Sequence, residues 1–427
     1  MPCALIINTL AGVLLSSLSR RNTGLISNFV LFAAKIRNIN ETSKILGLLF
    51  LQRIHFKEKD VILQSKVFFN NIDMSIEDKS RYVNDAVELL KELIATPRVS
   101  RDETVAADKM EVKMREWGLN PRREANNLWV VSDNFDDTKQ TILLNAHIDT
   151  VKPVATWTKN PHEPLLEGDK LFGLGSNDCG GGLVTLLQVF RVLNSQPRAY
   201  NLIYLASAEE EVSGKNGVEH VLPMLPKIDV AIVGEPTGMQ PAIAEKGLMV
   251  VDGYAKGVSG HAARNEGVNA IYEALDDLVW LRDYRFGKES PLLGPTKMTV
   301  TQVESGTQHN VIPDSLHFVL DIRTNEYYQN EYVFAFLQKH MKRCELKARS
   351  FRLHSSSIPA DHPLVKRCVE LGLKPFGSPT LSDQALMSFP SFKLGPGESS
   401  RSHSADEFIC ISEIENALTL YLDILSA

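Results

Sequence analysis

The sequence predicts an α/β protein in which a sheet flanked by helices is interrupted by a smaller α+β unit. Apolar runs alternate with helical patterns through the first part of the chain, the rhythm changes near Glu245, and strand and helix then resume. Such alternation favours a sheet covered by helices on both faces. The chain has 427 residues, too many for one ordinary hydrophobic core, so two domains are expected.

The first part of the chain supplies most of the predicted main sheet. Apolar side chains at helical spacing predict a helix over residues 80–96, and Gly118 ends a second helix over 106–117. The run TILLNA at 141–146 is typical of a buried strand. Further predicted elements are a helix at 183–193 and buried strands at 202–206 and 230–233.

The part of the chain after Glu245 has the order β-α-β-β-α-β, which is the ferredoxin-like pattern. Its predicted elements are a strand at 248–255, a helix at 268–283, strands at 297–303 and 316–322, a helix at 331–341 and a strand at 346–353. Helices at 363–371 and 412–425 then complete the first domain. We therefore expect a main domain made of residues 74–245 and 356–427, with residues 246–355 inserted into it.

Residues 1–73 do not fit this scheme. They are apolar and basic, with few acidic residues before Glu58. Their apolar runs at 4–18 and 25–34 are shorter than the ~20 residues of a spanning helix, and Arg20 and Arg21 follow the first run instead of preceding it. We expect an N-terminal extension that is not part of the mature protein, with Met74 as the real start. A targeting or anchoring role and a small folded element are the alternatives.

Composition excludes several classes of protein. Hydrophobic residues make up 44% of the chain and charged residues 23%, which indicates a soluble globular protein, and the net charge of -6 leaves no basic footprint for nucleic acid. The five cysteines are scattered and show no CxxC spacing, which argues against a disulfide framework and fits a reducing compartment. We expect a cytoplasmic protein without a membrane or nucleic-acid partner.

Five short segments carry acidic and histidine residues in an order that suggests chemistry. They read NAHIDT at 145–150, GSNDCGG at 175–181, EEE at 209–211, GEPT at 234–237 and SHSADE at 402–407. Histidines and carboxylates from these segments would suit two zinc-like ions that share a bridging carboxylate. Several of the segments follow predicted strands, and ligands collect at the carboxyl ends of strands in open α/β sheets.

Each segment alone has an ordinary structural interpretation. A single His after a strand is more often structural, and a run of three Glu is usually a solvated surface. The segment Gly173-Leu174-Gly175 superficially looks like a dinucleotide-binding loop, but position 178 is Asp and no GK[ST] follows. Nucleotide binding is therefore rejected, and the metal interpretation depends on the five segments together.

The order and content of the five segments resemble the M20 peptidase family of co-catalytic metallohydrolases, near acetylornithine deacetylase and succinyl-diaminopimelate desuccinylase. The resemblance extends from about Ser75 to the C-terminus. It implies a zinc-peptidase-like metal-binding domain with an inserted lid and dimerisation domain, and two divalent ions per subunit, Zn²⁺ or else Co²⁺. The metal ligands that it implies are His147, Asp178, Glu211, Glu235 and His403, with Asp178 bridging both ions.

The resemblance also implies a general base and the neighbours of the ligands. The base maps to Glu210, although a shift of the register by one would make Glu209 the base, and the position of Gly217 favours Glu210. Asp149 is expected to receive the other ring N–H of His147 and fix its tautomer. Cys179 stands where the family often has Lys, and we predict that it packs and is not a ligand.

Three residues of the inserted unit match further family positions. His261, in GVSGHA, is expected to reach the active site of a partner subunit and hold the developing oxyanion. Asn310 and Arg323 match substrate-contacting residues, and the planar fork of Arg suits a substrate carboxylate. A salt bridge on a strand face is the alternative for Arg323.

The function that the resemblance implies is hydrolysis of a linear amide bond by a two-metal deacylase. The expected substrate is a small N-acyl amino acid, namely N-acetylornithine or a relative in arginine biosynthesis, and a homodimer formed through the lid is expected. A succinyl-diaminopimelate desuccinylase and a metallo-dipeptidase are alternatives with the same chemistry. A non-catalytic binding module is disfavoured because every ligand and base position is filled.

Overall fold

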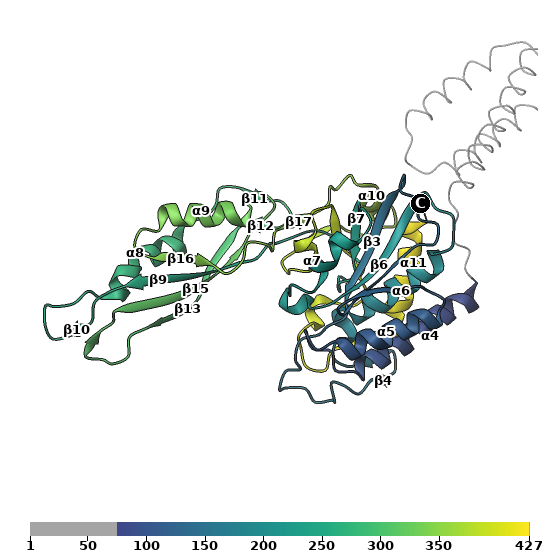
Figure 1. Cartoon of the computed structure of the whole chain (residues 1–427), viewed down its shortest axis with the longest axis horizontal. Helices are drawn as coiled ribbons and strands as arrows, with labels where there is room; N and C mark the ends of the chain where they lie inside the picture. Colours follow the sequence, from purple (N-terminus) through teal and green to yellow (C-terminus); the bar gives the residue numbers. More distant parts are fainter. Residues whose placement is uncertain (1–74, 427) are drawn as a thin grey trace, which may run out of the picture. The chain divides into compact units, whose positions relative to one another are not determined.

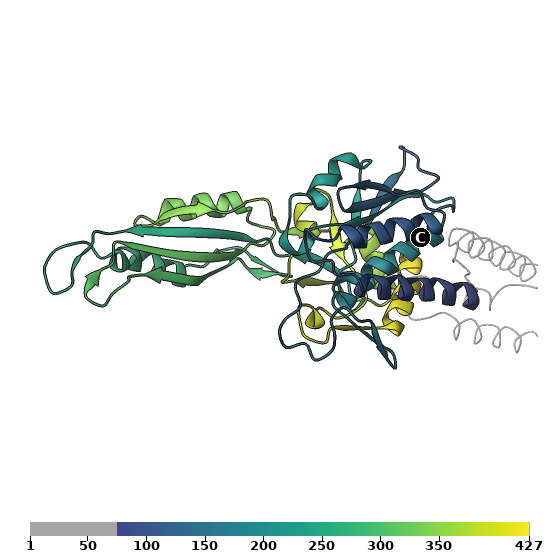
Figure 2. The ribbon, with the colours of Figure 1, turned by 60° about the horizontal axis from the view of Figure 1, so that its bottom comes forward.

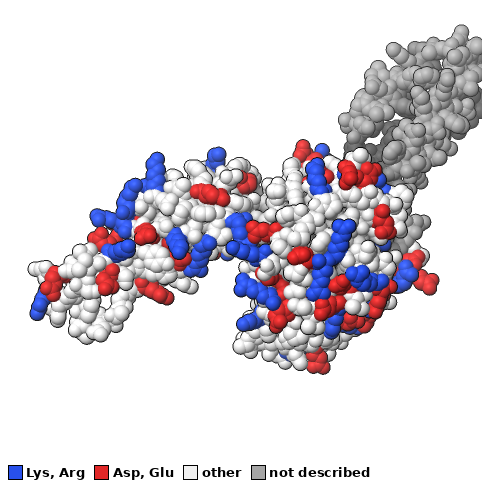
Figure 3. Space-filling model, in the orientation of Figure 1, with Lys and Arg blue, Asp and Glu red and all other residues white. Residues whose placement is uncertain are grey.

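A computed structural model describes residues 75–426. The expectations for residues 1–73 therefore lie outside the described part of the chain. Among residues 75–426, no helix combines the length and apolar character that crossing a membrane requires. Figure 3 shows basic and acidic side chains interspersed on the face it presents, with no single basic field.

The larger sheet contains the three buried strands that the sequence predicts in the first part of the chain. In spatial order its strands are β1 (Arg122–Glu124), β2 (Asn127–Val131), β6 (Tyr200–Ser207), β3 (Gln140–His147), β7 (Val230–Val233), β19 (Ser391–Lys393), β8 (Ala242–Glu245) and β17 (Ser356–Ser357), and β18 (Phe376–Ser378) also pairs with β8. Strands β6, β3, β7 and β19 run parallel to their neighbours in this series. Their carboxyl ends therefore meet at one edge of the sheet.

Both faces of these strands are covered. Leu144 packs in the hydrophobic cluster that includes α4 (Ile76–Ile94), α6 (Gly181–Leu193) and α11 (Ile411–Leu425). Its neighbour Leu143 belongs to a second cluster with α7 (Val218–Val221). Successive side chains of a strand point to opposite faces, so a strand that is covered on both sides reads as a continuous apolar run. The run at 141–146 is explained in this way.

The helices of the first cluster pack against one another as well as against the sheet. Helices α4, α6 and α11 contact each other pairwise, and Figure 1 shows them together on one side of β3 and β6. Helix α5 (Thr104–Glu116) lies beside α4, as Figure 2 shows. Helix α10 (Pro363–Glu370) contacts α11. A sheet flanked by helices is therefore the architecture of this part.

The inserted unit has the predicted order of elements. Its sheet runs β13 (Lys297–Ser305), β15 (Ser315–Arg323), β9 (Met249–Lys256) and β16 (Glu345–Ala348), all antiparallel, with helices α8 (Ala270–Asp283) and α9 (Asn330–His340). A separate core cluster joins these helices to the sheet. The fold class is thus confirmed, while the domain limits near residues 245 and 355 stay predictions.

Two element ends differ from the sequence expectation for local reasons. The helix expected from position 268 begins at Ala270, because Val268 bridges to Val258 and the side chain of Asn269 caps the helix by accepting from the Ile271 N–H. The strand expected to reach position 353 ends at Ala348. Beyond it the side chain of Asn330 donates to the carbonyls of Phe351 and Leu353.

The connections carry short elements. They are β4 (Leu165–Glu167), β5 (Lys170–Phe172) and β20 (Phe408–Cys410) in a three-stranded sheet, and the pairs β10 (Gly260–His261) with β14 (Val311–Ile312) and β11 (Glu289–Ser290) with β12 (Gly294–Pro295).

Candidate metal centre

The five predicted ligands come from the carboxyl edge of the larger sheet and from two loops beside it. His147 ends β3, Glu211 lies in the turn after β6, and Glu235 follows β7. Asp178 lies in the segment Ser176–Gly180 that leads into α6. The fifth residue, His403, lies in the loop before β20. Since β6, β3 and β7 are parallel neighbours, their ends place the first three side chains together.

Asp178 lies between the two histidines. Its Oδ1 is 3.4 Å from Nε2 of His147, and its Oδ2 is 3.4 Å from Nε2 of His403. On the first side, Oε1 of Glu235 is 3.7 Å from the same His147 nitrogen. On the second side, Oε2 of Glu211 is 3.0 Å from the His403 nitrogen. The side chains therefore form two groups, each with one His and one Glu, that share the carboxylate of Asp178.

The chemistry of these groups fits divalent cations. The side chains of Asp178, Glu211 and Glu235 are at most 13% exposed, and Oε1 of Glu235 is buried without a hydrogen-bond partner. Crowded buried carboxylates are costly unless a positive charge compensates them. Burial, followed by the charge of Asp178, raises the pKa of Glu235 to about 8. Imidazole nitrogens and carboxylate oxygens are the donor set that zinc accepts, so the site is suited to two such ions.

The three successive glutamates point to different surroundings. Glu209 has a positive φ of 56°, and its Oε1 accepts from Nδ2 of Asn216 at 2.9 Å. Glu210 lines the cavity in front of the ligands, and Glu211 faces His403. The arrangement agrees with the register in which Glu210 is the base and Glu211 a ligand, although these roles stay predictions.

Glu210 has the environment of a proton acceptor. Burial raises its pKa well above the usual range; His147 opposes this shift, while Glu235, Asp383 and Glu211 add to it. A carboxyl with a raised pKa holds a proton more readily than an ordinary carboxyl, which suits a group that accepts and returns one.

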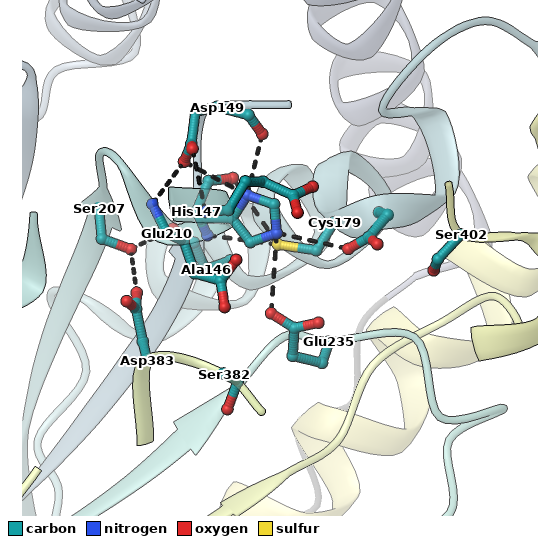
Figure 4. Close-up of polar contacts among 12 residues, drawn as sticks. Ala146, His147, Asp149, Cys179, Ser207, Glu210, Glu235, Ser382, Asp383 and Ser402 are labelled. Carbon is teal, nitrogen blue, oxygen red and sulfur yellow. Dashed lines mark hydrogen bonds and ion pairs between the residues drawn. The ribbon is translucent and has the colours of Figure 1, made fainter. Parts of the chain in front are cut away.

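Asp149 supports both His147 and the glutamate turn. Nδ1 of His147 lies 2.9 Å from the backbone carbonyl of Asp149 and 3.6 Å from its Oδ1. Figure 4 shows the ring of His147 between Asp149 and Glu235. The carboxylate of Asp149 accepts from the backbone N–H groups of Glu210 at 3.0 Å and of Glu211 at 3.2 Å. The predicted orienting residue thus also fixes the turn that carries the predicted base.

Two buried charged residues that the sequence analysis assigned no role hold the predicted ligand segments. Arg98 donates to the carbonyls of Ile148 and Gly175, and so joins the His147 and Asp178 segments. Glu407 accepts from the N–H groups of Gly175, Asn177 and Asp178 at 2.8–2.9 Å. Burial, followed by the charge of Asp178, raises the pKa of Glu407 to about 7. Glu407 lies within the last acidic motif, whereas Arg98 has no comparable sequence signal.

Cys179 is close to the ligands but is turned toward the backbone. Its Sγ accepts from the backbone N–H of His147 at 3.2 Å. His147, Cys179 and Glu235 form one group that could hold a metal, with ligand atoms within 4.8 Å of one another. Burial raises the pKa of the thiol to about 12, which favours the neutral form. The packing role of Cys179 remains our prediction.

A cavity of about 390 Å³ opens in front of the ligands. It is lined by Asp178, Glu210, Glu211, Glu235, Pro236, Thr237, Phe376, Ser378, Pro379, Thr380, Leu381, Lys393, Glu398, Ser399, Ser402 and His403. The cavity contains four of the five predicted ligands together with the predicted base, so it is the candidate substrate site.

The three predicted residues of the inserted unit are not among those that line this cavity. His261 lies in β10, and Nδ1 of its exposed ring accepts from the N–H of Ala263 at 3.1 Å. The backbone of Ala262 donates to the carbonyl of Asn310 at 3.0 Å, so the His261 and Asn310 segments are adjacent. Arg323 donates to both carboxylate oxygens of Asp321, at 2.9 and 3.2 Å, which is the strand-face ion pair considered as its alternative.

Comparison with known proteins adds independent evidence. The family model described as peptidase family M20/M25/M40 matches residues 143–427. An acetylornithine deacetylase from Proteus mirabilis is 27% identical over 361 residues, which cover 77% of this chain and 93% of that protein. A [LysW]-lysine/[LysW]-ornithine hydrolase from Sulfurisphaera tokodaii is 25% identical over 346 residues, covering 79% of this chain and 93% of that protein.

Solved structures show the same fold. A tripeptidase from Staphylococcus aureus superposes with a TM-score of 0.66 at 18% identity, covering 81% of this chain and 98% of that one. A dinuclear metal-binding peptidase of the M20 family from Bacillus subtilis gives a TM-score of 0.61 at 15% identity, with the same coverage.

Proposed function

Since the chain belongs to peptidase family M20/M25/M40, the metallohydrolases that act on amide bonds, we propose that it removes the acyl group from a small N-acyl amino acid. The observation that carries the proposal is the position of Asp178 between two His–Glu groups, with Glu210 lining the same cavity. A metallo-dipeptidase would need the same constellation and is the second candidate.

The proposed substrate is N-acetylornithine or a related N-acyl intermediate of arginine biosynthesis. Its support is the acetylornithine deacetylase that matches over 93% of its length. Succinyl-diaminopimelate is the alternative, because a desuccinylase of this name from Verminephrobacter eiseniae is also 27% identical, over 74% of its length.

We propose two divalent ions, Zn²⁺ with Co²⁺ as the alternative. His147 and Glu235 would hold one ion, Glu211 and His403 would hold the other, and Asp178 would be shared by both. When bound, they would polarise the amide carbonyl and lower the pKa of a water from 15.7 toward ~7. Glu210 takes the proton of the attacking water, whose oxygen adds to the acyl carbon. As the C–N bond breaks, Glu210 returns the proton to the leaving amine.

The inserted unit would complete the site from a second subunit. We propose that residues 246–355 form a lid and dimerisation domain, with His261 of the partner subunit stabilising the oxyanion and Asn310 and Arg323 contacting the substrate. The support is the surface of α8, where the exposed apolar side chains Ile271, Tyr272, Leu275 and Val279 recur at helical spacing. Tyr272 is 70% exposed, and together the four side chains form an apolar surface of the kind that marks a contact with another protein surface.

A cytoplasmic location is part of the same proposal. It is supported by the four cysteines of the described residues, Cys179, Cys344, Cys368 and Cys410, which are all free thiols.

One experiment tests the proposal directly. The purified protein is stripped of metal, titrated with Zn²⁺ or Co²⁺, and assayed against acetyl-amino acids, succinyl-amino acids and dipeptides. We expect metal-dependent hydrolysis that is fastest for an N-acetyl amino acid. Preferred cleavage of dipeptides would favour the second candidate, and binding of metal without hydrolysis of any amide would support a non-catalytic module.

A further inference from the structure

A buried ion pair lies at the wall of the cavity, behind the predicted ligands. Lys393 ends β19 and is 2% exposed, and Glu245 ends β8 and is fully buried. Nζ of Lys393 is 3.1 Å from Oε2 of Glu245. The same carboxylate oxygen accepts from Oγ of Ser382 at 2.8 Å and from Nε2 of Gln384 at 3.1 Å. Burial lowers the pKa of Lys393, but the charges of Glu245 and Glu235 outweigh this and raise it, so the ammonium stays charged.

Stability alone does not account for this pair. Replacing a buried ion pair by apolar residues of similar volume is often neutral or stabilising, so such a pair is weak evidence for a purely structural role. Lys393 is also the one Lys or Arg among the described residues that line the cavity. Its remaining contacts therefore indicate what the charge does.

The ammonium of Lys393 binds residues at and just after the end of β18. It donates to the carbonyl of Thr380 at 3.0 Å, to Oγ1 of Thr380 at 3.1 Å and to Oγ of Ser378 at 3.4 Å. The hydroxyls of Ser378 and Thr380 are 2.9 Å apart, and the N–H of Thr380 donates to Oγ of Ser378. Pro379 and Thr380 are exposed, and the bonds from Lys393 to Thr380 join this exposed segment to the buried ion pair.

We propose that Lys393 is a substrate-positioning residue. Anchored by Glu245, it holds one wall of the substrate cavity in place, and this wall consists of Ser378, Pro379, Thr380 and Leu381. These four residues line the cavity together with Glu210 and four of the five predicted ligands. The inference rests on the proposed function, because the wall would contact the part of the N-acyl amino acid that does not react.

The wall should affect substrate binding more than turnover. Lys393 has no hydrogen bond to Glu210 or to any predicted ligand; its contacts are the ion pair with Glu245 and the hydrogen bonds to Ser378 and Thr380. An interaction made equally in the ground state and the transition state raises KM when it is lost and leaves kcat unchanged. A residue that acts only on stability would change neither constant in folded protein.

Two variants of the full, metal-loaded protein test the proposal. The double variant Lys393→Met with Glu245→Gln removes both charges, so no unpaired charge stays buried. Thr380→Val removes one acceptor of Lys393 at an exposed position and leaves the ion pair intact. Lys227→Met is the control, because that lysine side chain is 86% exposed and its ion pair within residues 75–426 is with Asp229 across 2.8 Å.

We expect KM for the best N-acyl amino acid to rise about tenfold in the double variant, with kcat changed by less than about threefold and the metal content unchanged. Thr380→Val should shift KM in the same direction by a smaller factor, and Lys227→Met should match the wild type. An unchanged KM in the folded double variant, a fall in kcat alone, or a loss of metal overturns the proposal. If the double variant does not fold, an unchanged KM in Thr380→Val overturns it.

The wild-type protein distinguishes a failure of the proposed function from a failure of the proposed role of Lys393. Wild-type protein that hydrolyses no N-acyl amino acid refutes the proposed function and with it the substrate wall. Active wild-type protein together with an unchanged KM in the variants refutes the wall alone.

Discussion

The substitution Glu210→Gln is the most direct test of the proposed chemistry. It keeps the size of the side chain and removes the proton acceptor. The residue lines the cavity, and Asp149 holds its backbone N–H at 3.0 Å, so the substituted side chain should keep its position. A general base contributes about 10²–10⁴ to turnover. We therefore expect kcat to fall by this factor, which corresponds to about 2.7–5.4 kcal/mol of transition-state stabilisation.

The neighbouring glutamate provides a matched control. Glu209→Gln makes the same chemical change one residue earlier, at a side chain that accepts from Asn216 and does not line the cavity. Because Gln retains a carbonyl acceptor for that bond, we expect kcat within about threefold of the wild type, a change of less than ~0.7 kcal/mol.

Turnover of the best substrate and metal content by elemental analysis are measured on both variants. Glu210→Gln should keep both metals and lose turnover. If Glu210→Gln instead loses metal while Glu209→Gln loses turnover, the base is Glu209 and the assignment is wrong by one position. Full turnover in Glu210→Gln would refute the general-base mechanism itself.

Three further predictions concern the metals, the lid and the acid stability of the inserted unit. Chelation should abolish activity, and addition of Zn²⁺ or Co²⁺ should restore it; activity in metal-free protein would refute this. Asp178→Ala should lower the metal content at both positions, because the two carboxylate oxygens of Asp178 face the two histidines. Mixing inactive His261→Ala with inactive Glu210→Gln should give partly active heterodimers after subunit exchange, and an inactive mixture would contradict catalysis across the dimer. The hydrogen bond from Arg349 holds the pKa of Asp252 well below its usual range, although burial opposes this shift. The ionised carboxylate stabilises the fold at pH values above its unfolded-state pKa, and this stabilisation is lost as the pH falls through the lowered folded-state pKa. In a plot of the thermal-unfolding midpoint against pH, Asp252→Asn should therefore show a shallower fall at acid pH than the wild type. Parallel curves for the two proteins would rule this out.

Elements with a continuous apolar pattern could be predicted from the sequence, whereas elements made by long-range pairing could not. The strand expected at 230–233 is β7, Val230–Val233, because four successive buried side chains require cover on both faces. Strand β8 was not predicted. Its residues Ala242–Glu245 include two small alanines, and the strands beside it come from residues 356–393, more than a hundred positions later.

The same distinction holds at the site. The convergence of His147, Glu211 and Glu235 could be predicted because each lies at or just after the carboxyl end of a buried strand, where side chains of a parallel sheet meet. Arg98 and Lys393 could not, because the partners of Arg98 are backbone carbonyls 50 and 77 positions away and those of Lys393 include a loop 13 positions before it. Their roles depend on tertiary contacts that leave no local pattern.

The unequal exposure of the two histidines supports the proposal that a second subunit completes the site. The side chain of His147 is 1% exposed, whereas that of His403 is 55% exposed, although both face the carboxylate of Asp178. The His147 side is therefore enclosed by the chain itself, and the His403 side is open to water. Electrostatic stabilisation of an oxyanion is strongest where water is excluded. A lid from a partner subunit that carries His261 would enclose this open side, so the loss of activity in His261→Ala should be recovered only when an intact lid is supplied in trans.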